Sequence, residues 1–118
     1  MLKELAGIKR VILICGKSDL RRGISGLSAF IRLNYGLDRL DEGTLFLFCG
    51  NKRDRIKGLL FEEDRFCLLT VRLVDGVFQW PRNTNEARSI TKKQYRLLME
   101  GFTLEGSIRS TRKRTPIA

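Results

Sequence analysis

The sequence contains no histidine, and its three cysteines, Cys15, Cys49 and Cys67, are widely spaced without a Cys-x-x-Cys pair. Zinc sites of the common types use paired cysteine or histidine ligands, so the sequence predicts no metal site. Because the cysteines lie in or beside apolar runs, we expect buried, reduced thiols. No candidate general base lies near them in sequence, which argues against a nucleophilic cysteine.

Long apolar runs are also missing. The run at residues 11–15 is too short to span a membrane, and it lacks the longer apolar segment and cleavage site of a secretory signal. We therefore expect a cytoplasmic protein with no membrane contact. The sequence has no Walker loop, G-x-G-x-x-G motif, serine-nucleophile motif or internal repeat. These absences argue against the common enzyme classes, so we expect no enzymatic activity and no cofactor.

Acidic residues are scarce relative to basic ones. The 118 residues include 23 Lys and Arg against 13 Asp and Glu, which gives a formal net charge of +10. Such an excess favours phosphate binding and makes nucleic acid the default partner, although it also suits an anionic membrane or an acidic protein.

The strongest local concentration of charge lies between two apolar stretches. Lys52, Arg53, Arg55 and Lys57 occur within six residues, where an ordinary turn would carry Gly, Asn, Asp or Ser. Arginine offers a bidentate fork to phosphate, and Arg55 and Lys57 share a strand face, so this cluster predicts a phosphate contact. The alternative is a solvated turn whose cations pair with Asp54 or with the acidic residues 62–64.

An early helix is predicted after a buried first strand at residues 8–15. Ser18 or Asp19 can cap it, and the apolar spacing of Leu20, Ile24, Leu27 and Ile31 places all four on one face. Gly23 and Gly26 weaken this helix and favour a close approach by another segment.

Cations surround the predicted start of this helix. The sequence has Lys17, Arg21 and Arg22 there, and Arg32 lies further along the polar side. In one interpretation Asp19 caps the helix and the arginines are exposed. In the other, residues 16–19 and the helix N-terminus form an anion site.

Four further strands are predicted at residues 44–49, 55–61, 66–73 and 77–80, separated by short polar turns. Links this short connect antiparallel neighbours. Pro81 ends the last strand, and residues up to 89 are expected to form a loop. A capping box at Thr91 and Gln94 then begins a short amphipathic helix that Gly101 ends.

The chain ends in a stretch without acidic residues. Residues 107–118 hold Arg109, Arg112, Lys113 and Arg114, and we expect a basic disordered tail after a domain at residues 1–106. Without these four cations the balance is 19 minus 13, so the domain keeps a charge of +6.

Two further patterns could indicate a functional site but also have a simpler explanation. Phe78 and Trp80 fit a stacking platform for an unpaired base, but large aromatics more often form the core of a small domain. Asp19, Asp54 and Asp64 fit a three-carboxylate metal site, although no spacing rule brings them together.

Taken together, several segments resemble the small accessory protein, of the Orf2 or TnpB type, of bacterial insertion-sequence-66 elements. The matching residues run in order from about 8 to 102: residues 15–23 with Gly26 and Leu27, residues 45–48, residues 53–57, Arg72, Leu73, Gly76, Phe78, Trp80, Pro81, Thr91, Gln94, Leu97, Leu98, Glu100 and Gly101. The chain has Gly58, Leu59 and Leu60 where members of that family carry aromatic residues. The resemblance implies an accessory role in transposition beside a separate transposase, without chemistry of its own.

We therefore predict a single α+β domain with a mainly antiparallel sheet of about five strands, one early helix and one short C-terminal helix. The predicted function is that of a non-enzymatic accessory protein in DNA transposition, with DNA and the transposase of the same element as partners. The alternatives are a pure protein adaptor of the transposase, a general RNA- or DNA-binding module, and a phosphoryl-transfer enzyme. The sequence does not define the oligomeric state.

Overall fold

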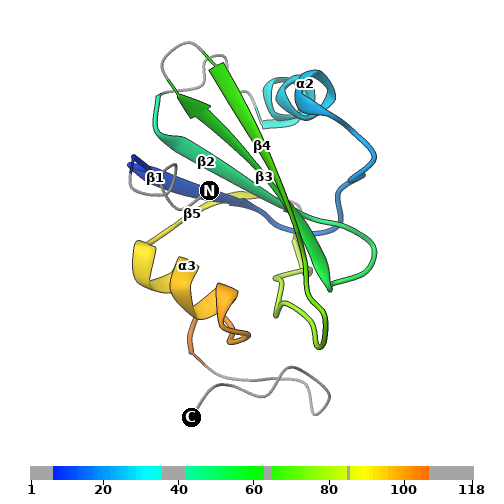
Figure 1. The fold of residues 1–118 in the computed structure, drawn as a ribbon, viewed down its shortest axis with the longest axis vertical. Coiled ribbons are helices and arrows are strands. Elements are labelled where there is room, and N and C mark those ends of the chain that lie inside the picture. Colours follow the sequence, from blue (N-terminus) through cyan, green and yellow to red (C-terminus); the bar gives the residue numbers. More distant parts are fainter. Residues whose placement is uncertain (1–6, 36–41, 63–64, 85, 107–118) are drawn as a thin grey trace.

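A computed structural model describes residues 7–35, 42–62, 65–84 and 86–106 of the chain (Figure 1). Five strands form one sheet, and the two helices lie against its opposite faces. In chain order the elements are β1 (Arg10–Ile14), α2 (Ile24–Tyr35), β2 (Thr44–Cys49), β3 (Arg55–Glu62), β4 (Arg65–Arg72), β5 (Ala87–Ile90) and α3 (Lys92–Met99).

The strands lie in the order β4-β3-β2-β1-β5. β1 and β2 are parallel and are connected through α2, whereas the other three neighbouring pairs are antiparallel. The short turns between β2, β3 and β4 account for their antiparallel pairing. The predicted α+β fold with a five-stranded, mainly antiparallel sheet and two helices is therefore confirmed.

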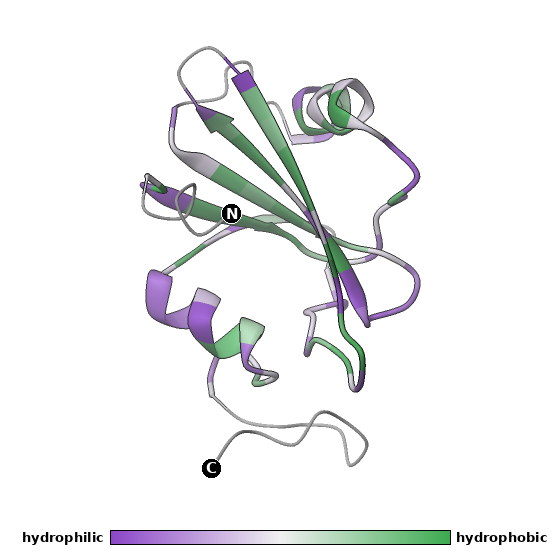
Figure 2. Cartoon of the chain, viewed as in Figure 1, coloured by the Kyte–Doolittle hydropathy of each residue, from purple (hydrophilic) through white to green (hydrophobic). Residues whose placement is uncertain are grey.

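Alternating side chains divide the core between the two faces of the sheet. The α3-side core contains Leu13, Leu45, Leu47, Ile56, Leu60, Phe78, Trp80 and Leu98, among others. The α2-side core contains Ile14, Phe46, Phe48, Leu59, Leu27 and Ile31. Figure 2 shows hydrophobic residues along the middle of β2, β3 and β4 and hydrophilic residues at the turn between β2 and β3.

The predicted last strand is wrong. Residues 77–80 form no strand, and the fifth strand is β5, in the stretch predicted to be a loop. The main chain of Phe78 donates to Arg53 O at 2.7 Å, so this segment crosses the β2–β3 turn instead of extending the sheet. β5 instead pairs with the free edge of β1. Only four residues long and partly polar, it has a weak strand signal of its own.

The predicted start of the early helix is also wrong. The helix begins at Ile24, and the main-chain N–H of Leu27 donates to Gly23 O at 2.9 Å, so neither Ser18 nor Asp19 caps it. The side chain of Asp19 accepts the main-chain N–H of Arg21 at 3.0 Å, which forms a local turn before the helix. Leu27 and Ile31 of the predicted apolar face are buried, and Leu20 packs on the same core from outside the helix.

The late helix is as predicted. Thr91 Oγ1 accepts the N–H of Gln94, and Gln94 Oε1 accepts the N–H of Thr91, both at 3.0 Å. After the helix, Gly101 has a φ of 100°, a left-handed conformation that glycine adopts without a steric penalty. α3 contacts β1, and Tyr95 and Met99 pack on the α3-side core.

The cysteines are free, and Cys15 and Cys49 are buried as predicted. Burial raises the pKa of both thiols, which keeps them protonated and unreactive. Cys67 is only half-buried on the edge strand β4, and its Sγ lies 3.3 Å from Glu62 Oε1.

Of the helices that the structure describes, none has the length and apolar character that crossing a membrane requires.

Candidate nucleic-acid interface

The antiparallel register of β3 and β4 brings cations together on the α2 side of the sheet. Arg55 lies directly opposite Arg72, and opposite residues of an antiparallel pair point to the same face. Lys57 lies opposite Phe48 of β2, which belongs to the α2-side core. Arg55 and Lys57 therefore share a strand face, as predicted, and Arg72 joins them across the strand pair.

A hydrogen bond connects these strand residues to the start of the helix. Lys57 Nζ donates to the main-chain oxygen of Arg22 at 3.2 Å, across 35 positions of sequence. Two basic segments that the sequence presents separately thus become neighbours. We call the five residues Arg21, Arg22, Arg55, Lys57 and Arg72 the basic surface.

Arg22 is held in place by an aromatic ring. Its guanidinium carbon lies 4.6 Å from the ring centroid of Phe30, a cation–π contact. A Cβ atom at Gly26 would lie 3.1 Å from Arg22 Cβ, so the glycine leaves room for the arginine against the first turn of α2. The approach by another segment that was predicted for Gly23 and Gly26 is therefore not found: a local arginine side chain lies at Gly26, and a Cβ atom at Gly23 would meet nothing within 4 Å.

Two carboxylates moderate the charge of the basic surface. Asp19 accepts from Arg21 Nε at 3.0 Å, and this hydrogen bond lowers the pKa of Asp19 to about 2. Asp54 accepts from Arg55 Nε at 2.9 Å, and this interaction lowers the pKa of Asp54. The proposed pairing of the turn cations with Asp54 is thus confirmed for Arg55. Five cations against two carboxylates leave a formal excess of three positive charges on the basic surface.

The other predicted cations lie elsewhere. Lys52 is exposed in the β2–β3 turn, Lys17 is exposed before α2, and Arg32 is exposed in the last turn of α2. Arg53 is exposed and lines a cavity on the α3 side. The structure thus divides the four-cation cluster between the two faces of the sheet. The tail residues Arg109, Arg112, Lys113 and Arg114 lie outside the described residues.

The helix N-terminus does not form the anion site considered for residues 16–19. α2 begins at Ile24, whereas the N–H of Ser18 donates to Cys49 O at 2.8 Å and fixes this turn against the end of β2. Sequence reasoning also missed Arg72 as a member of the basic surface. Its signal is the strand register, which places it opposite Arg55.

Phe78 and Trp80 are core residues. Both are buried, and Trp80 Nε1 donates to Ile14 O at 3.0 Å. Of the three carboxylates considered as a metal site, Asp19 and Asp54 each pair with an arginine, and Asp64 lies outside the described residues. Within the described ranges, no group of three or more potential metal ligands is present.

The structure is that of a small basic α+β protein in which cations gather on one face of a mixed sheet. Comparison with known families defines it further: residues 9–108 match the model of the family described as "IS66 Orf2 like protein", and the chain belongs to this family. The resemblance seen in the sequence is therefore confirmed. Membership associates the chain with the transposition of insertion sequences.

A relative from Sinorhizobium fredii (strain NBRC 101917 / NGR234), described as "Uncharacterized protein y4hO", is 33% identical over 93 residues. The matched region covers 79% of this chain and 80% of the relative. No solved structure matches the chain.

Proposed function

We propose that the protein is a non-enzymatic accessory of transposition that binds the phosphate backbone of element DNA through the basic surface and associates with the transposase. One observation carries this proposal: Lys57 Nζ lies 3.2 Å from Arg22 O, which joins the strand cations to those before α2. Family membership supports the transposase as the protein partner.

The arrangement of the arginines supports phosphate as the ligand. Like charges directly opposite on neighbouring strands are destabilising, yet Arg55 and Arg72 occupy such positions. Asp54 offsets part of this repulsion, and a phosphate group bound between the two guanidinium groups would offset more. Backbone binding of this kind is independent of base sequence.

The test is binding to duplex DNA across a salt series, with element ends compared against scrambled duplexes, single-stranded DNA and RNA. Each lost phosphate contact reduces the slope of log K against log salt by about 0.9 on duplex DNA. The triple variant Arg55→Ala, Lys57→Ala, Arg72→Ala should therefore reduce this slope by up to about 2.7.

A matched control variant carries Arg32→Ala, Lys92→Ala and Arg96→Ala, which removes three exposed cations outside the basic surface. If both triple variants lose the same affinity and slope, binding reflects net charge alone and the basic surface is the wrong location. Divalent-metal-dependent cleavage of DNA by the wild-type protein would contradict the non-enzymatic proposal.

An exposed apolar residue favours a second candidate, a protein adaptor that contacts only the transposase. Leu33 on α2 is 84% exposed. If Leu33→Ser abolishes co-purification with the transposase and the wild-type protein binds no nucleic acid at low salt, the adaptor replaces the DNA-binding proposal. Binding to an apolar protein surface would also depend little on salt, unlike phosphate binding.

A further inference from the structure

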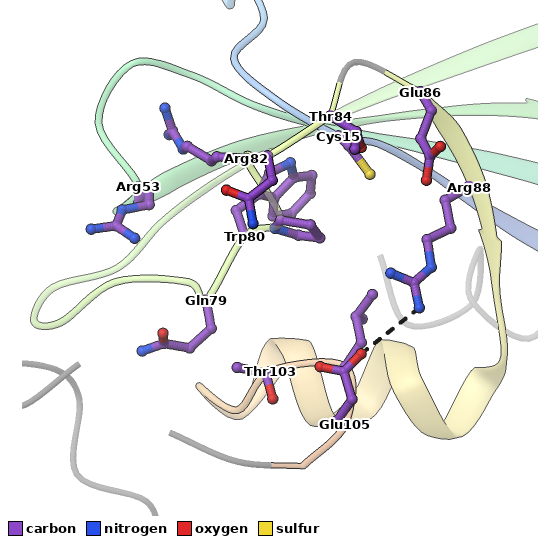
Figure 3. A pocket seen from close by; sticks show the side chains of 13 residues that line it. Cys15, Arg53, Gln79, Trp80, Arg82, Thr84, Glu86, Arg88, Thr103 and Glu105 are labelled. Atoms are coloured by element: carbon purple, nitrogen blue, oxygen red, sulfur yellow. Dashed lines mark ion pairs between the residues drawn. The ribbon is translucent and has the colours of Figure 1, made fainter. Parts of the chain in front are cut away.

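A cavity of about 630 Å³ lies on the α3 side of the sheet, on the face opposite the basic surface. Its wall comes from four segments: Cys15 after β1, Arg53 in the β2–β3 turn, the loop after β4 with the start of β5, and the segment after α3 (Figure 3). This volume lies in the range of small-molecule sites, about 300–1,000 Å³, and far exceeds what a single inorganic anion needs.

The wall contains buried hydrogen-bond donors without acceptors. Gln79 is only 7% exposed, and its Nε2 has no hydrogen-bond partner among the described residues. Arg82 Nε is likewise buried and unpartnered within the described part of the chain, although its terminal nitrogen donates to Gly50 O. Buried donors are rarely left unpaired, and both of these belong to residues of the cavity wall.

Charge is distributed unevenly around the cavity. Arg53 and Gln79 lie on one side of Trp80, and Glu86, Arg88 and Glu105 lie on the other (Figure 3). On the second side Arg88 pairs with Glu105 at 3.8 Å. One end of the cavity therefore carries positive charge and a neutral amide, whereas the other carries both carboxylates beside an arginine. Two carboxylates in the wall disfavour an extended polyanion.

We propose that this cavity binds a single nucleotide. Its phosphate lies at the end formed by Arg53 and Gln79, where an arginine fork and an amide N–H donate to phosphate oxygens. Its base lies toward Glu86 and Arg88, where the carboxylate accepts from the donors of a base edge and the guanidinium donates to its acceptors. Trp80, Pro81 and Leu104 supply an apolar wall between them. The site is independent of the basic surface, so either can be absent without the other.

Calorimetry with the full chain tests this proposal, with the fluorescence of Trp80, the chain's single tryptophan, as a local probe. The probes are dAMP, deoxyadenosine and inorganic phosphate, together with a 5′-phosphorylated dinucleotide that distinguishes a free nucleotide from a strand end. We expect dAMP to bind at least about tenfold more tightly than either deoxyadenosine or phosphate, because only dAMP engages both ends of the cavity.

Arg53→Ala should weaken dAMP binding by about tenfold or more, since it removes a charge-assisted hydrogen bond, and should leave deoxyadenosine unaffected. Gln79→Leu should weaken dAMP binding by about tenfold. Arg32→Ala, at an exposed position on α2 outside both sites, is the matched control and should leave the affinity for dAMP unchanged. Because Arg53 is exposed, its substitution tests the site even if Gln79→Leu fails to fold.

Absence of both heat and fluorescence change at millimolar dAMP would overturn the proposal. Equal binding of phosphate and dAMP would also overturn it, because the base would then contribute nothing. Wild-type affinity in Arg53→Ala would refute the assigned phosphate end.

Discussion

Trp80 connects the loop after β4 to the central region of the sheet. It is 4% exposed, and its indole N–H donates to Ile14 O of β1. A large aromatic ring contributes packing, and the N–H contributes a buried hydrogen bond between segments far apart in sequence. A single side chain thus fixes the position of the loop that forms one wall of the cavity.

Replacing Trp80 with Phe keeps an aromatic ring but removes the N–H donor. We expect the free energy of unfolding to fall by about 1–3 kcal/mol, the typical cost of leaving a buried group unsatisfied. Urea denaturation followed by circular dichroism measures this change. Leu33→Ala, at an exposed position, is the control and should stay within about 0.5 kcal/mol of wild type. A Trp80→Phe variant as stable as wild type would show that this hydrogen bond adds nothing.

Asp19 gives a prediction on pH. Its pKa is lowered to about 2 in the folded protein by the hydrogen bond from Arg21, below the value of about 3.9 in an unfolded chain. The folded state therefore binds fewer protons than the unfolded state between these values. The stabilising contribution is present above about pH 4 and is lost as the pH falls toward 2.

Carboxyl ¹³C NMR should show Asp19 titrating near pH 2 in the wild-type protein. In Arg21→Ala its midpoint should move up toward the ordinary aspartate value, because the side-chain hydrogen bonds and the positive charge of Arg21 are removed while the main-chain hydrogen bond remains. An unchanged midpoint in the variant would mean that Arg21 is not the cause of the shift.

At the scale of elements, α3 depends on its first turn. Eight residues are too few for a stable isolated helix, so its capping box and its contact with β1 both matter. Because Thr91 and Gln94 satisfy each other's main-chain N–H groups, they act as a pair.

Thr91→Ala should lower the free energy of unfolding by about 1 kcal/mol, the usual cost of losing a cap. Gln94→Ala should lower it by less, and the double variant should fall short of the sum because both residues belong to one motif. Urea denaturation measures all three. Lys93→Ala, an exposed neighbour in the same turn, serves as the control. Strict additivity would show that the two hydrogen bonds form independently.

The elements that sequence predicts well are those whose signals are local. β2 has its predicted boundaries, and β3 and β4 each agree with prediction to within one residue at either end, because apolar runs and short polar turns specify a meander. β5 was missed because its pairing partner β1 lies far away in sequence and its own residues are partly polar. The start of α2 was misplaced because Asp19 bonds to Arg21 in a local turn.

The candidate sites likewise combine features that local sequence patterns predict with features that depend on contacts between distant segments. The sequence located Arg55 and Lys57 on one strand face and placed Arg21 and Arg22 in the first turn of the predicted helix, which in fact begins after them at Ile24. Their meeting depends on the hydrogen bond from Lys57 to Arg22, which no local pattern encodes. The cavity could not be predicted because four separate segments form its wall, and one of its residues, Arg53, was grouped with its sequence neighbours.

At the scale of the whole molecule, the charge is distributed between the sheet domain and the last twelve residues. Residues 107–118 carry four of the 23 cations and none of the 13 acids. Residues 1–106, the predicted domain, keep a charge of +6 and include the basic surface.

A chain ending at Gly106 should unfold within about 0.5 kcal/mol of the full chain, because the predicted tail adds charge without adding to the core. Its DNA affinity should fall, and the salt slope should decrease by up to about 3.6, which is four contacts at about 0.9 each. Urea denaturation and DNA titration across salt measure the two effects. A large loss of stability would place the domain boundary beyond residue 106.

The position of β5 next to β1 has a consequence for synthesis on the ribosome. β1 is made before β5, so one of its edges gains its partner only when Ala87–Ile90 emerges. The β2–β4 meander needs only local pairings, and such contacts form fastest. During translation the nascent chain therefore carries an apolar strand with one unpaired edge at the side of a nearly complete sheet, a state open to aggregation until β5 is made.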